Sequence, residues 1–287
     1  MLPRHGLDES MAFRYWAGAA LTACALASSA CQPSAGERAQ ASEKDGVHGL
    51  VTSELERARS ARVFFSHHSV GRNLLDGAAS VSAGQPGGKL EILPIESAAT
   101  HAGPAWFHAS GGQNQHPESK VDYFVEALGK QAELKPQLAF MKFCYVDFNP
   151  ETNVDALFGY YERAIASIKR EHPAIRLAHV TVPLTRHPTE LKSRVFRLLG
   201  RSVWEDAANI KRQQFNSKLL ATFTGDAIFD LARAESTRAD GTRDEYEAGG
   251  QKYYALDERY AADEGHLNER GQRELGAELI RFVAKAL

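Results

Sequence analysis

Cysteine is scarce in this 287-residue chain, and its scarcity excludes one kind of stabilisation. Two of the three cysteines, Cys24 and Cys31, stand near the start, so Cys144 is alone in the rest of the sequence. A single thiol cannot form an internal disulfide, even in an oxidising compartment. The sequence also contains no internal repeat.

An excess of charge of one sign is lacking too. Lysine and arginine number 34 against 36 aspartate and glutamate residues, which gives a formal net charge of −2. Without a basic excess, no nucleic-acid partner is expected. With 43% hydrophobic and 24% charged residues, the composition is that of a globular protein with one large domain.

The apolar run near the start is too short to cross a bilayer, which takes about 20 apolar residues. Residues 15–27, YWAGAALTACALA, follow an arginine and precede small residues, as in a secretory signal. Residues 28–31, SSAC, resemble a bacterial lipobox with Cys31 as the lipidated residue. Residues 21–24, LTAC, match too but leave a very short apolar region, and residues 25–27, ALA, suit an ordinary signal peptidase.

These features divide the chain into three parts. Residues 1–31 are predicted to be a signal peptide with its lipobox, residues 32–47 a disordered tether, and residues 48–287 the folded domain. Translation could begin at Met11 instead of the first residue. We expect an exported protein of the bacterial periplasm or cell envelope, in contact with the membrane only through a lipid on Cys31.

Short apolar runs alternate with helical patterns across the folded domain. The predicted strands cover residues 62–65, 90–95, 137–144, 175–182 and 227–231, and long polar loops are expected at 97–119 and up to 264. The loop at 97–119 is expected to be functional, because loops of that length in compact domains usually are. The alternation predicts an α/β fold, a three-layer α/β/α sandwich with a five-stranded parallel sheet of flavodoxin-like type.

Residues 61–77, ARVFFSHHSVGRNLLDG, read as a strand, a polar corner and the beginning of a helix. Ligands in such sheets bind at the carboxyl ends of strands, where the N–H groups of a following helix point at them. Ser69 stands at that helix start and is the first candidate nucleophile. It could equally serve as a cap for the helix beginning at Val70.

A nucleophilic serine needs a base and a third group that orients the base. Residues 263–268, DEGHLN, place Asp263 three residues before His266 and precede the closing helix. A local turn there would let the carboxylate meet one imidazole nitrogen while the other faces the sheet. Because the serine follows the first strand and this pair precedes the last helix, the sheet would bring them together.

This arrangement resembles the SGNH (GDSL-type) hydrolase family. Residues 67–69, His-His-Ser, correspond to the family's first Gly-Asp-Ser block, and Asp263 through His266 to its closing Asp-x-x-His block. The resemblance implies Ser69 as nucleophile, His266 as general base and Asp263 as the carboxylate that orients it. The His-His-Ser-Val-Gly pattern suggests a divergent branch of the family.

The resemblance also implies an oxyanion hole, formed by the Ser69 N–H and by a glycine of the second block. Residues 110–114, SGGQN, fall where that block is expected, with Gly112 as the donor. The third block normally supplies an asparagine, and no residue after the strand at 137–144 matches its pattern. Asn114 or Asn149 could replace it, or the hole has one donor fewer.

Several other residues leave alternatives open. His67 and His68 are adjacent, so one is expected to pack structurally and the other to line the substrate site. Trp106 could stack on a sugar or hold its loop down. A metal site built from the histidines lacks regular ligand spacing, and no cofactor is expected. Cys144, in an apolar strand, is expected to be a buried small side chain.

The resulting hypothesis is a serine esterase that removes an acyl group, such as O-acetyl, from a carbohydrate or a similar polar small molecule. Acyl transfer to a sugar hydroxyl would use the same three residues. The rival is a non-catalytic envelope lipoprotein that uses this fold to bind carbohydrate or protein. The missing third-block asparagine favours that rival, whereas Ser69, Asp263 and His266 oppose it. The sequence leaves the oligomeric state open.

Overall fold

The computed structural model describes residues 50–130 and 133–287. The predicted signal peptide, its lipobox at Cys31 and the tether therefore lie outside the described residues. Within the described ranges, no helix has both the length and the apolarity that a membrane span requires.

The centre of the fold is a parallel sheet of six strands in the order β2-β3-β1-β4-β5-β6. Its strands are β1 (Val63–Ser66), β2 (Ile92–Pro94), β3 (Trp106–Ala109), β4 (Leu138–Met141), β5 (Arg176–Val180) and β6 (Ala227–Phe229). All five predicted strands are present, so the α/β class is confirmed. The predicted count of five is wrong, because β3 lies inside the segment expected to be a loop.

That segment holds a short 3-10 helix, η1 (Ile95–Ala99), as well as β3. Strand β3 pairs in parallel with β1 on one side and with β2 on the other, so it is an inner strand of the sheet. Without the edge strand β2, the order β3-β1-β4-β5-β6 is the 2-1-3-4-5 order of flavodoxin-like sheets. The segment 97–119, expected to be one long loop, is therefore divided by η1 and β3 into shorter loops.

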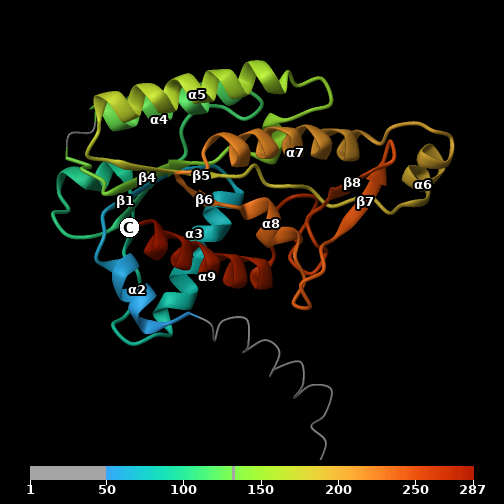
Figure 1. Cartoon of the computed structure of the whole chain (residues 1–287). Helices are drawn as coiled ribbons and strands as arrows, with labels where there is room; N and C mark the ends of the chain where they lie inside the picture. The colour runs from blue at the N-terminus through green and yellow to red at the C-terminus, as the bar shows by residue number, and fades with distance from the viewer. Residues whose placement is uncertain (1–49, 131–132) are drawn as a thin grey trace, which may run out of the picture. The chain divides into compact units, whose positions relative to one another are not determined.

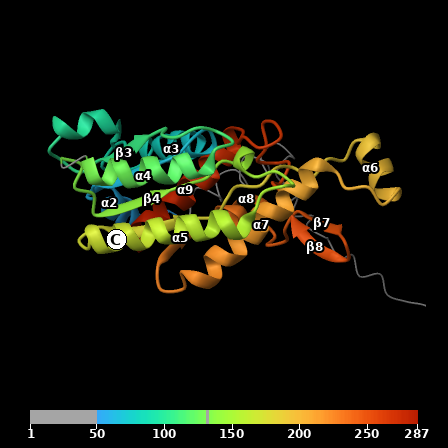
Figure 2. The same cartoon turned by 90° about the horizontal axis from the view of Figure 1, so that it is seen from above.

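Helices cover both faces of the sheet (Figure 1). One face carries α2 (Thr52–Arg59), α3 (Val70–Ala83), α8 (Leu231–Ser236) and α9 (Glu269–Ala286), and the other carries α4 (Pro117–Lys130), α5 (Val154–Glu171) and α7 (Trp204–Thr222). Seen from above, α4 and α5 lie side by side (Figure 2). Along β1, Val63 and Phe65 enter one core and Phe64 the other, as the alternation of a strand requires.

Two further elements lie outside the sheet, helix α6 (Leu191–Leu198) and a hairpin of β7 (Glu245–Ala248) and β8 (Gln251–Tyr254). The hairpin and α8 occupy the second predicted polar loop, which is a further correction. Gly249 and Gly250 form the turn with φ of 57° and 76°. Two successive residues with positive φ are what a two-residue hairpin turn needs.

Helices α3 and α9 pack against each other at glycines. A Cβ on Gly77 would lie 1.7 Å from the Gln272 carbonyl oxygen, and one on Gly276 would lie 2.4 Å from the Ala78 nitrogen. Both clashes are with backbone, so the helices could approach this closely only through glycine. Since α3 begins just after Ser69 and α9 begins shortly after the Asp263–His266 segment, this contact sets the spacing of the candidate site.

We therefore expect Gly276→Ala to destabilise the protein by about 1–3 kcal/mol, the usual cost of overpacking a close contact. The measurement is urea unfolding followed by circular dichroism. Gly129→Ala in α4 is the matched control, because its new Cβ would have no neighbour within 4 Å. That control should gain up to about 1 kcal/mol from helix propensity. Equal stabilities of the two variants would contradict the close-packing interpretation.

Candidate active site

The candidate site lies at the carboxyl ends of the strands, where the loops that follow β1, β3 and β4 meet. The His68 Nε2 atom donates to the Gly111 carbonyl at 2.8 Å, which joins the first loop to the second. The Ser69 hydroxyl lies 3.8 Å from the Cys144 sulfur, which joins it to the third. These contacts bring three segments that are distant in sequence to one edge of the sheet.

Ser69 has an unusual backbone, with φ of 26° and ψ of −90°. A positive φ is strained for any residue with a Cβ, and such strain persists only where the surrounding structure enforces it. The side chain makes no capping hydrogen bond to α3, although Ser69 holds the N-cap position. The capping alternative is therefore not what this side chain does in the structure.

The segment before α9 holds His266 against Asp263. One carboxylate oxygen lies 2.7 Å from His266 Nδ1, and the other accepts the N–H groups of Gly265 and His266 at 2.9 and 2.8 Å. Burial alone would raise the pKa of Asp263, but these hydrogen bonds outweigh it and lower that pKa to about 2. An ionised Asp263 therefore fixes the His266 ring with Nε2 directed elsewhere.

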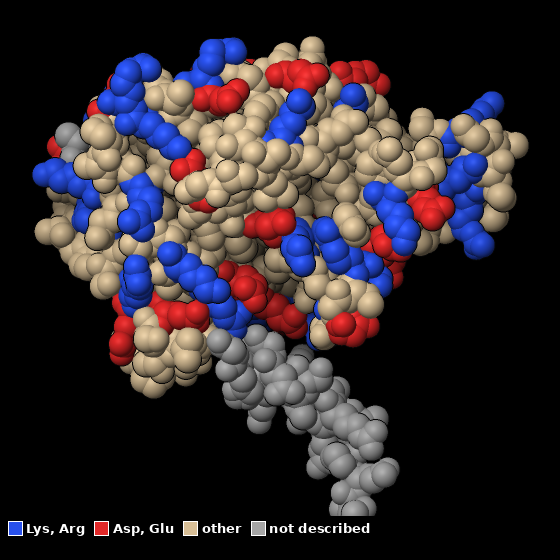
Figure 3. All heavy atoms as spheres, viewed as in Figure 1, with Lys and Arg blue, Asp and Glu red and all other residues tan. Residues whose placement is uncertain are grey.

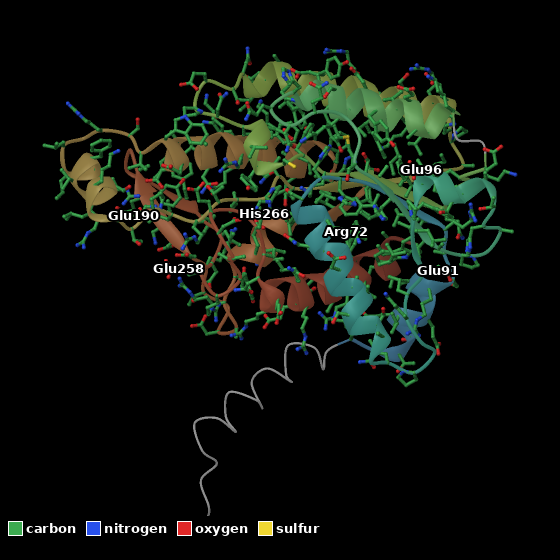
Figure 4. All side chains as sticks on the ribbon, turned by 180° about the vertical axis from the view of Figure 1, so that it is seen from behind. Arg72, Glu91, Glu96, Glu190, Glu258 and His266 are labelled. Atoms are coloured by element: carbon green, nitrogen blue, oxygen red, sulfur yellow. The ribbon has the colours of Figure 1, made fainter. Side chains whose placement is uncertain are left out.

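This segment is tied to the helix that Ser69 begins. The Leu267 N–H donates to the Asn73 side chain, one helical turn beyond Ser69, at 3.2 Å. The His266 ring meets the Tyr145 ring edge to face at 5.5 Å, and Figure 4 shows His266 beside the start of α3. Within the described ranges, no hydrogen bond joins Ser69 Oγ to the His266 imidazole. The Ser69 hydroxyl faces the Cys144 sulfur instead.

His67 packs in the interior and does not line the site, which corrects its assignment to substrate binding. It is 2% exposed and stacks on His108, with its Nε2 3.3 Å from the His108 Nδ1. Burial, and then the charge of Lys142, lower the pKa of His67 well below its ordinary value. A Cβ on Gly71 would lie 2.4 Å from the His67 Cβ, so the His-x-x-x-Gly spacing has a packing reason.

His68 is the one of the two adjacent histidines that stays partly accessible. Burial lowers its pKa, so the imidazole is neutral when its Nε2 donates to the loop after β3. The histidines do not gather around a common point. Among the described residues, no group of three His, Cys, Asp or Glu side chains could hold a metal ion.

Trp106 is also corrected as a substrate-binding candidate. It lies in β3, is buried, and its indole N–H donates to the Ala58 carbonyl at 2.9 Å. The packing alternative is therefore the right one, and Trp106 anchors α2 to the sheet.

The oxyanion-hole candidates occupy different environments. The N–H groups of Ser69 and Gly112 have no hydrogen-bond partner within the described ranges. Gly112 has φ of 74°, and a Cβ there would lie 2.6 Å from the Lys120 nitrogen, so glycine is required. Asn114 is exposed and its side-chain oxygen accepts from Lys120, while Asn149 is exposed in the turn before α5.

Sequence reasoning missed the charged residues that lie beneath this edge. Lys142 is completely buried, 3.8 Å from the Cys144 sulfur, and burial lowers its pKa. Lys120 and Asp147 form a buried ion pair at 2.6 Å, and the same carboxylate accepts the Cys144 N–H at 2.7 Å. The signal in the sequence was a lysine directly after the four apolar residues of β4.

Comparison with known proteins gives distant structural similarity. No family model and no curated protein matches the chain. A structure described as a platelet activating factor from Streptococcus pneumonia is 14% identical, with a TM-score of 0.46 and coverage of 87% of this chain and all of that one. The periplasmic domain of a lipopolysaccharide acetyltransferase from Salmonella ser. Paratyphi A is 12% identical, with a TM-score of 0.43 over 76% and 81%.

A structure described as a lipolytic protein of the G-D-S-L family from Desulfitobacterium hafniense DCB-2 is 8% identical, with a TM-score of 0.40 over 79% of this chain and 99% of that one. At these identities and scores, the chemistry has to be argued from this chain's own residues. The strand order confirms the expected α/β class with a flavodoxin-like sheet. The divergent block around Ser69 stays a prediction.

The low pKa of Asp263 can be tested directly. Because it lies below the ordinary value of 3.8, the ionised carboxylate contributes stability above about pH 4 that is lost as the pH falls toward about 2. Asp263→Asn should therefore lose stability less steeply than the wild type over that interval, in urea unfolding at a series of pH values. Carbon-13 NMR of the carboxyl should give a midpoint near 2, and a midpoint near 3.8 would disprove the arrangement.

Proposed function

We propose that this protein is an exported serine esterase that deacylates a carbohydrate or a similar polar small molecule. The observation that carries the proposal is the hydrogen bond between Leu267 and Asn73. It holds the Asp263–His266 pair one helical turn from Ser69, whose backbone is strained. We further propose that the protein works in the periplasm or cell envelope, attached by a lipid on Cys31.

In the proposed reaction, Ser69 Oγ attacks the ester carbonyl carbon and its proton passes to His266 Nε2. Asp263 favours this step, because it holds the other ring nitrogen and stabilises the imidazolium that forms. The carbonyl oxygen becomes an oxyanion, which would accept the free N–H groups of Ser69 and Gly112. Each such donor contributes about 3 kcal/mol to transition-state stabilisation in known enzymes.

Collapse of this intermediate expels the alcohol, which takes the proton from His266 and leaves the acyl group on Ser69. Water then enters, loses a proton to the same imidazole, and releases the carboxylic acid. If a sugar hydroxyl enters instead of water, the protein is an O-acyltransferase. Before attack, Ser69 Oγ has to turn from Cys144 toward His266, and catalytic hydrogen bonds are often loose in structures without substrate.

The test is labelling of the full chain with a fluorophosphonate, which reacts with activated serines, together with hydrolysis of p-nitrophenyl acetate. Ser69→Ala and His266→Ala should abolish both signals, and Asp263→Asn should lower turnover on the order of 10³-fold or more. Ser80→Ala and His116→Ala are matched controls at exposed positions and should leave both signals unchanged.

Two outcomes would contradict the proposal. A protein folded by circular dichroism that takes no label would favour the carbohydrate- or protein-binding module. Labelling that survives Ser69→Ala and is lost in Cys144→Ala would make the thiol the nucleophile. Addition of a sugar acceptor separates the two reactions, because an acyltransferase would form an acylated sugar faster than free acid.

A further inference from the structure

Helix α6 presents its apolar residues to solvent. Leu191, Val195 and Leu198 follow the spacing of one helix face, and they are 75%, 41% and 86% exposed. Leu199, directly after the helix, is 65% exposed. A helix of a globular protein normally turns such a face toward the core, so an exposed one marks an interaction site.

The inner side of α6 is fixed to the rest of the molecule. Arg197 donates to the Asp206 carboxylate in the first turn of α7 at 2.9 Å, and to the Pro188 carbonyl at 2.7 Å. Phe196 and Ser193, on the same side, are partly buried. Because these contacts hold the side with Ser193, Phe196 and Arg197 inward, α6 cannot bury Leu191, Val195 and Leu198 by rotating.

Positive charge surrounds the exposed apolar face. Lys192 and Arg194 lie on either side of it and Arg201 follows the helix, whereas the carboxylate of Glu190 lies at the N-cap, before Leu191. The guanidinium groups of Arg194 and Arg201 have no partner within the described ranges. Figure 3 shows the corresponding blue cluster over the part of the surface where α6 lies.

We propose that α6 docks on the surface of an anionic phospholipid bilayer. Leu191, Val195 and Leu198 would enter the acyl-chain boundary, while Lys192 and Arg194 would contact lipid phosphates, as in interfacial amphipathic helices. A second copy of the chain is the poorer occupant, because two such patches would bring like charges together. This docking does not depend on the proposed triad.

The segment that leads into α6 contacts the candidate active site. In the chain between β5 and α6, the Arg186 N–H donates to the carbonyl of Glu264, within the Asp263–His266 segment, at 2.8 Å. Glu190 and Glu258 lie on the side of His266 that faces α6 (Figure 4). A bilayer bound by α6 would therefore lie near the edge of the sheet where acyl groups would enter.

The test uses the full chain with vesicles of phosphatidylcholine alone or mixed with equal parts of phosphatidylglycerol. Leu198→Trp, combined with Trp16→Phe and Trp204→Phe, leaves the buried Trp106 as the other indole. We expect lipids with brominated acyl chains to quench the introduced indole in the anionic vesicles and far less in the neutral ones. An unquenched indole in both would overturn the proposal.

Sedimentation with the same vesicles measures the contribution of each residue. Lys192→Ser and Arg194→Ser should each weaken partitioning of the protein into the anionic vesicles about fivefold. Lys285→Ser and Leu220→Ser, exposed on α9 and α7, are the matched controls and should change nothing. The predicted leader is the same in every variant, so it cannot produce a difference between them.

Equal partitioning of the α6 variants and the controls would assign membrane binding to another part of the chain and refute the proposal. A dimer that Leu198→Ser dissociates, without vesicle binding, would make a second copy the occupant and refute it too. Fluorophosphonate labelling of the α6 variants should stay unchanged, so a failure of docking is distinguishable from a failure of the esterase proposal.

Discussion

The close packing of α3 against α9 is the constraint on which the candidate site depends. At Gly77 and Gly276 the two helix backbones approach more closely than any side chain would allow. The first helix begins just after Ser69 and the second begins just after the Asp263–His266 segment. Their contact therefore brings the proposed nucleophile and base to the same edge of the sheet, and the bond between Leu267 and Asn73 fixes their register.

Buried charged residues pack against the loop after β4, at the edge of the sheet where the candidate site lies. Lys120 and Asp147 compensate each other's desolvation, and the carboxylate also accepts the Cys144 N–H. Burying an ion pair is costly unless its remaining hydrogen bonds are made, so this pair holds the loop after β4 in one conformation. Lys142, directly after β4, lies against the Cys144 sulfur. Burial, and then the charge of Lys142, lower the pKa of the neighbouring His67 and keep it neutral. Together these contacts hold Cys144 in its place beside Ser69.

The fold was predictable where the signal is local and strong. The apolar strands β1, β4 and β5 stand out from the sequence, and so does the capped, periodic helix α5. Strand β3 was missed because WFHA is short and lies between turn-forming residues, and its partners β1 and β2 define it as a strand. The β7–β8 hairpin was missed although EYEAGGQKYY contains the Gly-Gly turn and flanking strand residues that indicate it.

The sequence by itself determined the α/β class and the contact between Asp263 and His266, because three residues of chain in a turn suffice to form it. Tertiary structure decided the burial of Trp106 and His67, the position of Cys144 beside Ser69, and the outward face of α6. Local patterns specify periodicity and turns. Burial and the partner of a side chain depend on segments far apart in sequence, which only the packed sheet and helices bring together.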